Sequence, residues 1–198
     1  MKDFFKYQEE IANLQYTINL LLWELRVVAP KDSETDLINL ISYHEKRLFN
    51  LQTSIEYYNL LNGAINSQEY KNLSIEEQRY IQNLLKRYQK NKNVPIDFYE
   101  EYSKVKAVAN VMWRKAKNAN DYKIYEPYLD KIIKLTKTYY EYMYPSASNI
   151  YDAMLSDYEY GVDSKLLDKL FSKLKEGIIK LIPNNEIKVE EPYFEYTN

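Results

Sequence analysis

The sequence predicts an all-α protein. Only 3 of the 198 residues are glycine and 6 are proline, so few tight turns can form and long helices are favoured. Apolar residues recur at spacings of three and four along most of the chain, which is the period of an amphipathic helix. No stretch alternates between apolar and polar residues for long, so strands are not predicted outside the C-terminal tail, EIKVEEPYFEYTN, which we expect to be extended or disordered.

The N-terminal third of the chain predicts two long helices joined by a short turn. An apolar stripe spans residues 2–28, and Pro30 ends that helix because proline cannot continue it. A second stripe begins after a cap at Asp32 or Ser33 and stops near Gly63, a plausible C-terminal glycine. Two long helices with a short connection form an antiparallel helical hairpin.

Five further helices are predicted after this hairpin. Ser74 and Glu77 have the spacing of a capping box, Pro95 suits a first helical turn, and Asp163 can cap the last helix. These helices are expected at about residues 75–91, 95–119, 127–143, 150–158 and 163–181. The prediction is therefore about seven helices: a long N-terminal antiparallel helical hairpin followed by a helical array. We expect residues 1–183 to form a single all-helical domain and residues 184–198 to form an irregular C-terminal tail.

Composition and charge exclude several classes of protein. The net charge is −2, so no global field attracts nucleic acid or an anionic membrane. The chain has no cysteine, which excludes disulfides and thiolate metal sites. The N-terminus lacks the apolar core of a signal peptide, and no apolar run approaches the ~20 residues of a membrane span. We therefore expect a cytoplasmic protein that binds neither membrane nor nucleic acid.

Sequence motifs for metal-dependent chemistry are missing. The only histidine is His44, and the H-E-x-x-H zinc helix fails because Leu48 stands four residues later. A di-iron site needs Glu-x-x-His, but Ile41 lies three residues before His44. Carboxylates such as Glu100 and Glu101 leave an oxygen-only cation site formally open, although a solvated helix face is the better interpretation.

Motifs for other chemistry are missing as well. The three glycines are far apart, so no phosphate-binding loop is present, and no G-x-S-x-G nucleophile elbow occurs. The basic residues between Lys104 and Lys117 interleave with Trp113, as in some phosphate-binding patches. Helical spacing distributes these charges around the axis, so we interpret them as a solvated face.

The stretch MWRKAKNANDYKIYEPYLDKIIKL, residues 112–135, crowds polar and aromatic residues between two apolar runs. It resembles the carboxypeptidase Taq family of zinc metallocarboxypeptidases, with its Trp-x-x-Ala helix end, Asp-aromatic turn and aromatic-x-Pro-x-Leu helix start. The stretch YDAMLSDYEYG, residues 151–161, is similar to a second motif of that family. The family's Leu-x-Trp-Asp has a diverged counterpart in LLLWE, residues 20–24, which Pro30 follows. Tyr160 and Val162 depart from the family's Pro and Met, as does the segment after Trp23.

The resemblance covers about residues 7–182 and implies the N-terminal helical region of such an enzyme. In that family, all-α subunits enclose a groove with zinc at its floor, and subunits commonly pair as homodimers. The zinc helix and the substrate-binding motifs of the family have no counterpart in these 198 residues, so the resemblance assigns no catalytic and no metal-binding residue here. The positions that carry it, interpreted as structural or groove-wall residues, are Trp23, Trp113, Ala116, Asp121, Pro127, Tyr151, Asp152, Asp157, Tyr158, Glu159 and Gly161.

The resemblance therefore predicts a chain without peptidase activity of its own and without a cofactor, while a full-length parent would use zinc or another divalent metal on peptide substrates. The implied partner is a C-terminal catalytic region or a second copy of the chain. A stand-alone helical interaction module that has lost the peptidase chemistry is the alternative. Within residues 112–135 we expect a junction between two helices rather than a site. In that junction, Asp121 caps the turn, Trp113 packs at the seam and Arg114 bonds helix-end carbonyls.

Overall fold

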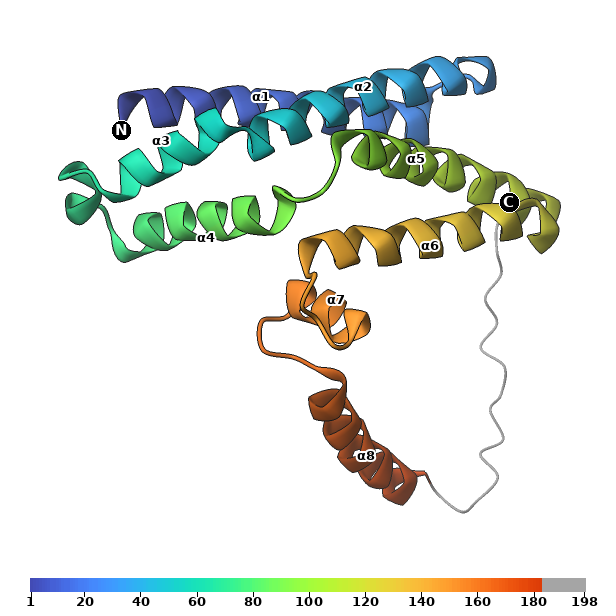
Figure 1. Ribbon diagram of the computed structural model, residues 1–198. Coiled ribbons are helices and arrows are strands. Elements are labelled where there is room, and N and C mark those ends of the chain that lie inside the picture. The colour runs from blue at the N-terminus through green and yellow to red at the C-terminus, as the bar shows by residue number, and fades with distance from the viewer. Residues whose placement is uncertain (183–198) are drawn as a thin grey trace. The chain divides into compact units, whose positions relative to one another are not determined.

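The protein is all-α, as predicted, in a computed structural model that describes residues 1–182. These residues contain eight α-helices and no strand, and Figure 1 shows them in chain order. The helices are α1 (Lys2–Trp23), α2 (Glu34–Thr53), α3 (Ile55–Ile65), α4 (Ile75–Asn91), α5 (Ile96–Ala119), α6 (Glu126–Met143), α7 (Ile150–Tyr158) and α8 (Ser164–Leu181). The expected tail, residues 184–198, lies outside the described part of the chain.

The chain divides into two compact units, the first spanning Met1–Ile150 and the second beginning at Tyr151. In the first unit α1 and α2 form the predicted antiparallel hairpin, and α5 and α6 form another antiparallel pair (Figure 1). The second unit contains α7 and α8. The single domain expected for residues 1–183 stays a prediction.

The second long helix of the prediction is two helices, which accounts for eight helices instead of about seven. Ser54 interrupts it with an extended backbone, φ −70° and ψ 150°, and its side chain accepts a hydrogen bond from the Tyr57 amide at 3.0 Å. The Tyr7 hydroxyl of α1 donates to the Leu51 carbonyl and lies 3.0 Å from the Ser54 hydroxyl, which fixes the break against α1. The break was missed because the apolar spacing continues through it, and a single serine within such a run does not by itself specify an N-cap.

Other predicted helix ends have mixed outcomes. The capping box is confirmed, because the Ser74 hydroxyl accepts from the Glu77 amide and the Glu77 carboxylate accepts from the Ser74 amide. Ser33 does not cap α2, since its hydroxyl donates back to the Pro30 carbonyl at 2.8 Å and a short 3₁₀ turn leads into the helix. Gly63 does not end α3, which continues to Ile65.

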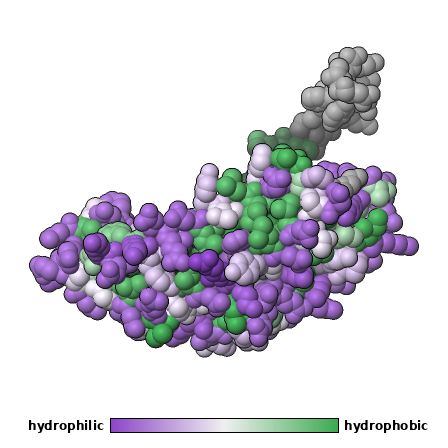
Figure 2. All heavy atoms as spheres, turned by 90° about the horizontal axis from the view of Figure 1, so that it is seen from above, coloured by the Kyte–Doolittle hydropathy of each residue, from purple (hydrophilic) through white to green (hydrophobic). Residues whose placement is uncertain are grey.

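Two clusters of buried side chains hold the first unit together. The larger joins α1, α3 and α4 around Ile18, Leu61 and Ile81, each 1% exposed or less. Burying a side chain of this size contributes about 1.5–3 kcal/mol. The smaller cluster joins the end of α1, α2 and α5 through Leu25, Ile41 and their neighbours. The face shown in Figure 2 is mostly hydrophilic, with apolar patches between the polar residues.

Candidate functional site

The stretch from α5 to α6 is a helix junction. Asn120 ends α5 in the left-handed conformation, φ 49°, and the amides of Asn120 and Asp121 bond the Lys117 and Ala116 carbonyls at 3.2 and 3.0 Å. This pattern of paired bonds across a left-handed residue is a Schellman helix end. The Asp121 carboxylate then accepts from the Lys123 amide at 3.0 Å and caps a short 3₁₀ turn, Tyr122–Ile124. Pro127 lies in the first turn of α6, where its missing N–H has no consequence.

Arg114 ties this junction to the end of α1. After Trp23 the helix continues as a π-helical turn, Glu24–Val28, whose i+5 bonding would pair the Leu25 carbonyl with residue 30. Residue 30 is proline and has no N–H. The Arg114 guanidinium supplies the missing donor to the Leu25 carbonyl at 3.0 Å, and it also donates to the Arg26 carbonyl at 3.0 Å. The expectation that Arg114 bonds helix-end carbonyls is therefore confirmed.

Glu34 completes this contact from the first turn of α2. Its carboxylate lies 2.8 Å from Lys115 Nζ and 3.8 Å from the Arg114 guanidinium, and its side chain is only 14% exposed. The role of Glu34 could not be predicted from the sequence because it lies about eighty positions before its partners. An acidic residue in a first helical turn is also common for its interaction with the helix dipole alone.

The sequence suggested that Trp113 packs at the seam between the two helices, but its side chain is exposed. It is 46% exposed and lines an open hollow of about 430 Å³ together with Ala116, Lys117, Asp121 and Tyr125. Lys117 Nζ lies 5.3 Å from the centre of the indole ring, a cation–π contact. Trp23 is exposed as well, at 54%.

The second set of signature residues lies in the second unit, where two carboxylates hold the start of α8. Asp152 accepts from the Ser164 amide at 2.8 Å, and Asp163 accepts from the Leu166 amide at 2.8 Å. The turn between α7 and α8 contains Gly161 with φ 83°, a conformation that favours glycine. The contact of Asp152 could not be read from spacing, because it spans twelve residues across a turn.

The other signature residues of this unit lie in or next to α7. Tyr151, Asp157 and Tyr158 belong to that helix, and Tyr151 and Tyr158 are exposed. Glu159 follows directly after α7 and precedes Gly161.

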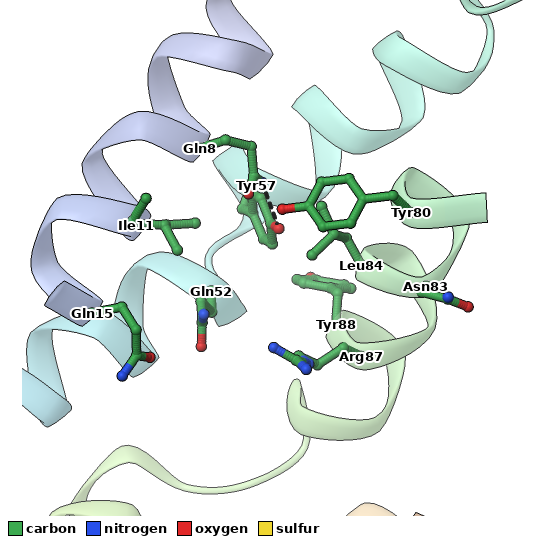
Figure 3. Close-up of a pocket in the computed structure, with 11 residues that line it drawn as sticks. Gln8, Ile11, Gln15, Gln52, Tyr57, Tyr80, Asn83, Leu84, Arg87 and Tyr88 are labelled. Carbon is green, nitrogen blue, oxygen red and sulfur yellow. Dashed lines mark hydrogen bonds between the residues drawn. The ribbon is translucent and has the colours of Figure 1, made fainter. Parts of the chain in front are cut away.

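A deeper hollow lies between α1, α3 and α4, with a volume of about 420 Å³ (Figure 3). Its polar wall carries amide side chains such as Gln8 and Gln52, the phenols of Tyr57 and Tyr80, and the guanidinium of Arg87. No pattern in the sequence predicts it, because the lining residues come from four helices that meet only in the folded chain.

The described residues do not assemble a metal site. Within residues 1–182, no three His, Cys, Asp or Glu side chains lie close enough together to hold an ion. In the same part of the chain, no helix is long and apolar enough to cross a bilayer.

Comparison with known proteins identifies the family. The model of the carboxypeptidase Taq (M32) metallopeptidases matches residues 3–195, nearly the whole chain. The chain belongs to the M32 family. Carboxypeptidase 1 of Bacillus subtilis is 32% identical over 181 residues, and Thermostable carboxypeptidase 1 of Pyrococcus furiosus is 29% identical over 198. The matches cover 91% and 97% of this chain but only 36% and 38% of those relatives, so the chain spans little more than a third of their length.

Solved M32 structures share the fold described above. The crystal structure of BsuCP superimposes with a TM-score of 0.84 at 31% identity and covers 91% of this chain and 36% of its own. A structure of the Pyrococcus furiosus carboxypeptidase gives a TM-score of 0.70 at 27% identity, with 91% of this chain and 35% of that chain covered. The resemblance inferred from the sequence motifs is therefore confirmed for the family and its fold.

Proposed function

We propose that this chain is the N-terminal, non-catalytic helical region of an M32 carboxypeptidase-like protein and forms one wall of its substrate groove. The observation that carries the proposal is a match along nearly the whole chain that covers little more than a third of each relative. The parent reaction would be removal of C-terminal residues from peptides. A full-length parent would use zinc or another divalent metal, which acts on the scissile carbonyl and on water.

The described residues, 1–182, do not fit a catalytic metal. A catalytic zinc needs three protein ligands from His, Asp, Glu or Cys, and the chain has a single histidine and no cysteine. No cluster of three such side chains occurs in residues 1–182. We therefore assign no catalytic step to any of its residues, and Asp121, Asp152 and Arg114 support the fold by the contacts described above.

Activity and metal content of the purified chain test this proposal together. We expect no release of C-terminal amino acids from peptides with or without added Zn²⁺, and no stoichiometric zinc by elemental analysis after dialysis. Carboxypeptidase 1 of Bacillus subtilis, treated in the same way, serves as the positive control. Chelator-sensitive release of C-terminal residues by the chain alone would refute the proposal.

A stand-alone interaction module is the second candidate, and α8 is the observation that favours it. None of its side chains is buried, and Leu170, Phe171 and Leu174 are each more than half exposed. An apolar face of this kind is stabilised by a partner. Whether the gene continues beyond Asn198 into H-E-x-x-H separates the two candidates: continuation favours the peptidase, and a stop codon favours the module.

The apolar face of α8 also supports association of the isolated chain. We propose that the partner is a catalytic region of the M32 fold or, without it, a second copy of the chain, and that the protein acts in the cytoplasm. Light scattering at increasing concentration tests self-association. Leu170→Lys should shift the protein toward monomer while Lys169→Leu should not. A monodisperse wild-type monomer at high concentration would count against association.

A further inference from the structure

We propose that the hollow between α1, α3 and α4 binds the carboxylate of a small amino acid-like ligand with an apolar side chain. Its volume, about 420 Å³, lies in the range of small-molecule sites. All of its walls belong to the first compact unit, with Gln8 from α1, Gln52 from the end of α2, Tyr57 from α3 and Arg87 from α4. Figure 3 shows the side chains of Tyr80, Arg87 and Tyr88 reaching from α4 toward α1.

The charge of the lining indicates an anion. Arg87 is the only ionised side chain among the eleven lining residues, and none of them is an acid. Its guanidinium forms no ion pair and no hydrogen bond with any residue of the part that the structure describes. A guanidinium presents its donors as a planar fork that matches a carboxylate in two parallel hydrogen bonds.

A second donor faces the same space. Tyr57 is 3% exposed, and its phenol oxygen accepts a hydrogen bond from Gln8 Nε2 at 2.7 Å. The phenol proton must therefore point elsewhere, and no residue from 1 to 182 accepts it. Burial raises the pKa of Tyr57, the Gln8 hydrogen bond and the Arg87 charge oppose that rise, and the hydroxyl remains a donor at neutral pH. Figure 3 shows the Tyr80 hydroxyl directed toward the same point.

The rest of the lining selects the kind of anion. One guanidinium and neutral phenols balance a single negative charge, as on a carboxylate, better than the charge of a phosphate group. Ile11, Leu84 and the ring of Tyr88 provide an apolar surface for a side chain. The side-chain carbonyl of Gln52 can accept a hydrogen bond from an α-ammonium group. A free amino acid with an aromatic or aliphatic side chain fits all three parts.

This inference goes beyond the proposed function, because it concerns binding by the chain alone and requires no peptidase activity. Titration calorimetry of the full chain with L-phenylalanine at pH 7 and low salt tests it, with L-phenylalaninamide and inorganic phosphate as comparison ligands. We expect binding of L-phenylalanine with a Kd on the order of 1 mM. L-phenylalaninamide, which lacks the carboxylate, and inorganic phosphate, whose negative charge exceeds that of a carboxylate, should each bind at least about tenfold more weakly.

Two variants and a matched control locate the site. Arg87→Gln should weaken binding about tenfold, and Tyr57→Phe, which removes only the hydroxyl, about threefold to tenfold. Arg79→Gln removes a second arginine of the same helix, which is exposed like Arg87 but does not line the hollow, and should leave the affinity within about twofold. Circular dichroism verifies that each variant is folded. Equal binding of L-phenylalaninamide, equal affinity of the Arg87 and Arg79 variants, tighter binding of phosphate, or no binding at about 10 mM would each overturn the proposal.

Discussion

The Arg114 contact gives the sharpest stability prediction. Replacing Arg114 with alanine removes two hydrogen bonds of 3.0 Å to the Leu25 and Arg26 carbonyls and leaves the Leu25 carbonyl without its donor, because Pro30 has no N–H. A hydrogen bond that involves a charged group contributes about 1.5–3 kcal/mol when it is sheltered from water. The Arg114 side chain is 30% exposed, so water replaces part of this loss. We expect the free energy of unfolding to fall by about 2 kcal/mol.

Urea denaturation followed by circular dichroism measures this change, since the slope with urea should stay constant if only stability is affected. Arg114→Lys keeps the charge but loses the fork, so it should cost about half as much. Lys115→Ala is the matched control: it removes an ion pair with Glu34 at 2.8 Å from a half-exposed side chain and should cost less than about 1 kcal/mol. Equal losses for the Arg114 and Lys115 alanine variants would refute the role given to the guanidinium fork.

Three further predictions concern single side chains. Asp121→Ala should lower the free energy of unfolding by about 1 kcal/mol, and Asp121→Asn should lower it by much less, because asparagine caps as well as aspartate. Unchanged stability in urea together with reduced activity in a full-length parent would contradict the structural role of Asp121. Ser54→Ala should cost about 1–2 kcal/mol in the same assay, more than Ser33→Ala, since the Ser54 hydroxyl both caps α3 and contacts Tyr7. Burial raises the pKa of the Tyr99 phenol. The folded state therefore keeps the phenol proton, whereas the unfolded chain loses it near the ordinary pKa of about 10. The free energy of unfolding is unaffected by this group below that pH and falls as pH rises above it. Tyr99→Phe should therefore reduce this alkaline fall by about 1 kcal/mol per pH unit above about pH 10.5, and an unchanged slope would show that the ring is not buried.

The extent of the helices was largely predictable because their signals are local. Ser74 with Glu77 and Asp163 with the Leu166 amide act within three residues of each other, so sequence spacing predicts the caps that the structure contains. The break at Ser54 was missed for the opposite reason. It depends on Tyr7, which lies 47 positions away and meets Ser54 only when α1 packs against α2 and α3.

The candidate sites were predictable only in part. The residues 112–135 were correctly interpreted as a junction, since left-handed asparagine, a capping aspartate and an early proline are sequence-local features. The bonding of Arg114 to helix-end carbonyls was expected, but its partner Glu34 and the exposure of Trp113 depend on how α5 meets α1 and α2. The hollow between α1, α3 and α4 could not be predicted from the sequence, because it combines residues that are far apart in the chain.

The sequence by itself determined the fold class, the amphipathic face of each helix and the M32 signature, because these depend on residue spacing within single helices. Tertiary structure alone decided which faces are covered. The apolar residues of α1, α3 and α4 meet in a common core around Leu61, whereas those of α8 have the same spacing and remain exposed at Leu170 and Leu174. The physical reason is that periodicity specifies which side of a helix is apolar, while burial also requires a second surface placed against it.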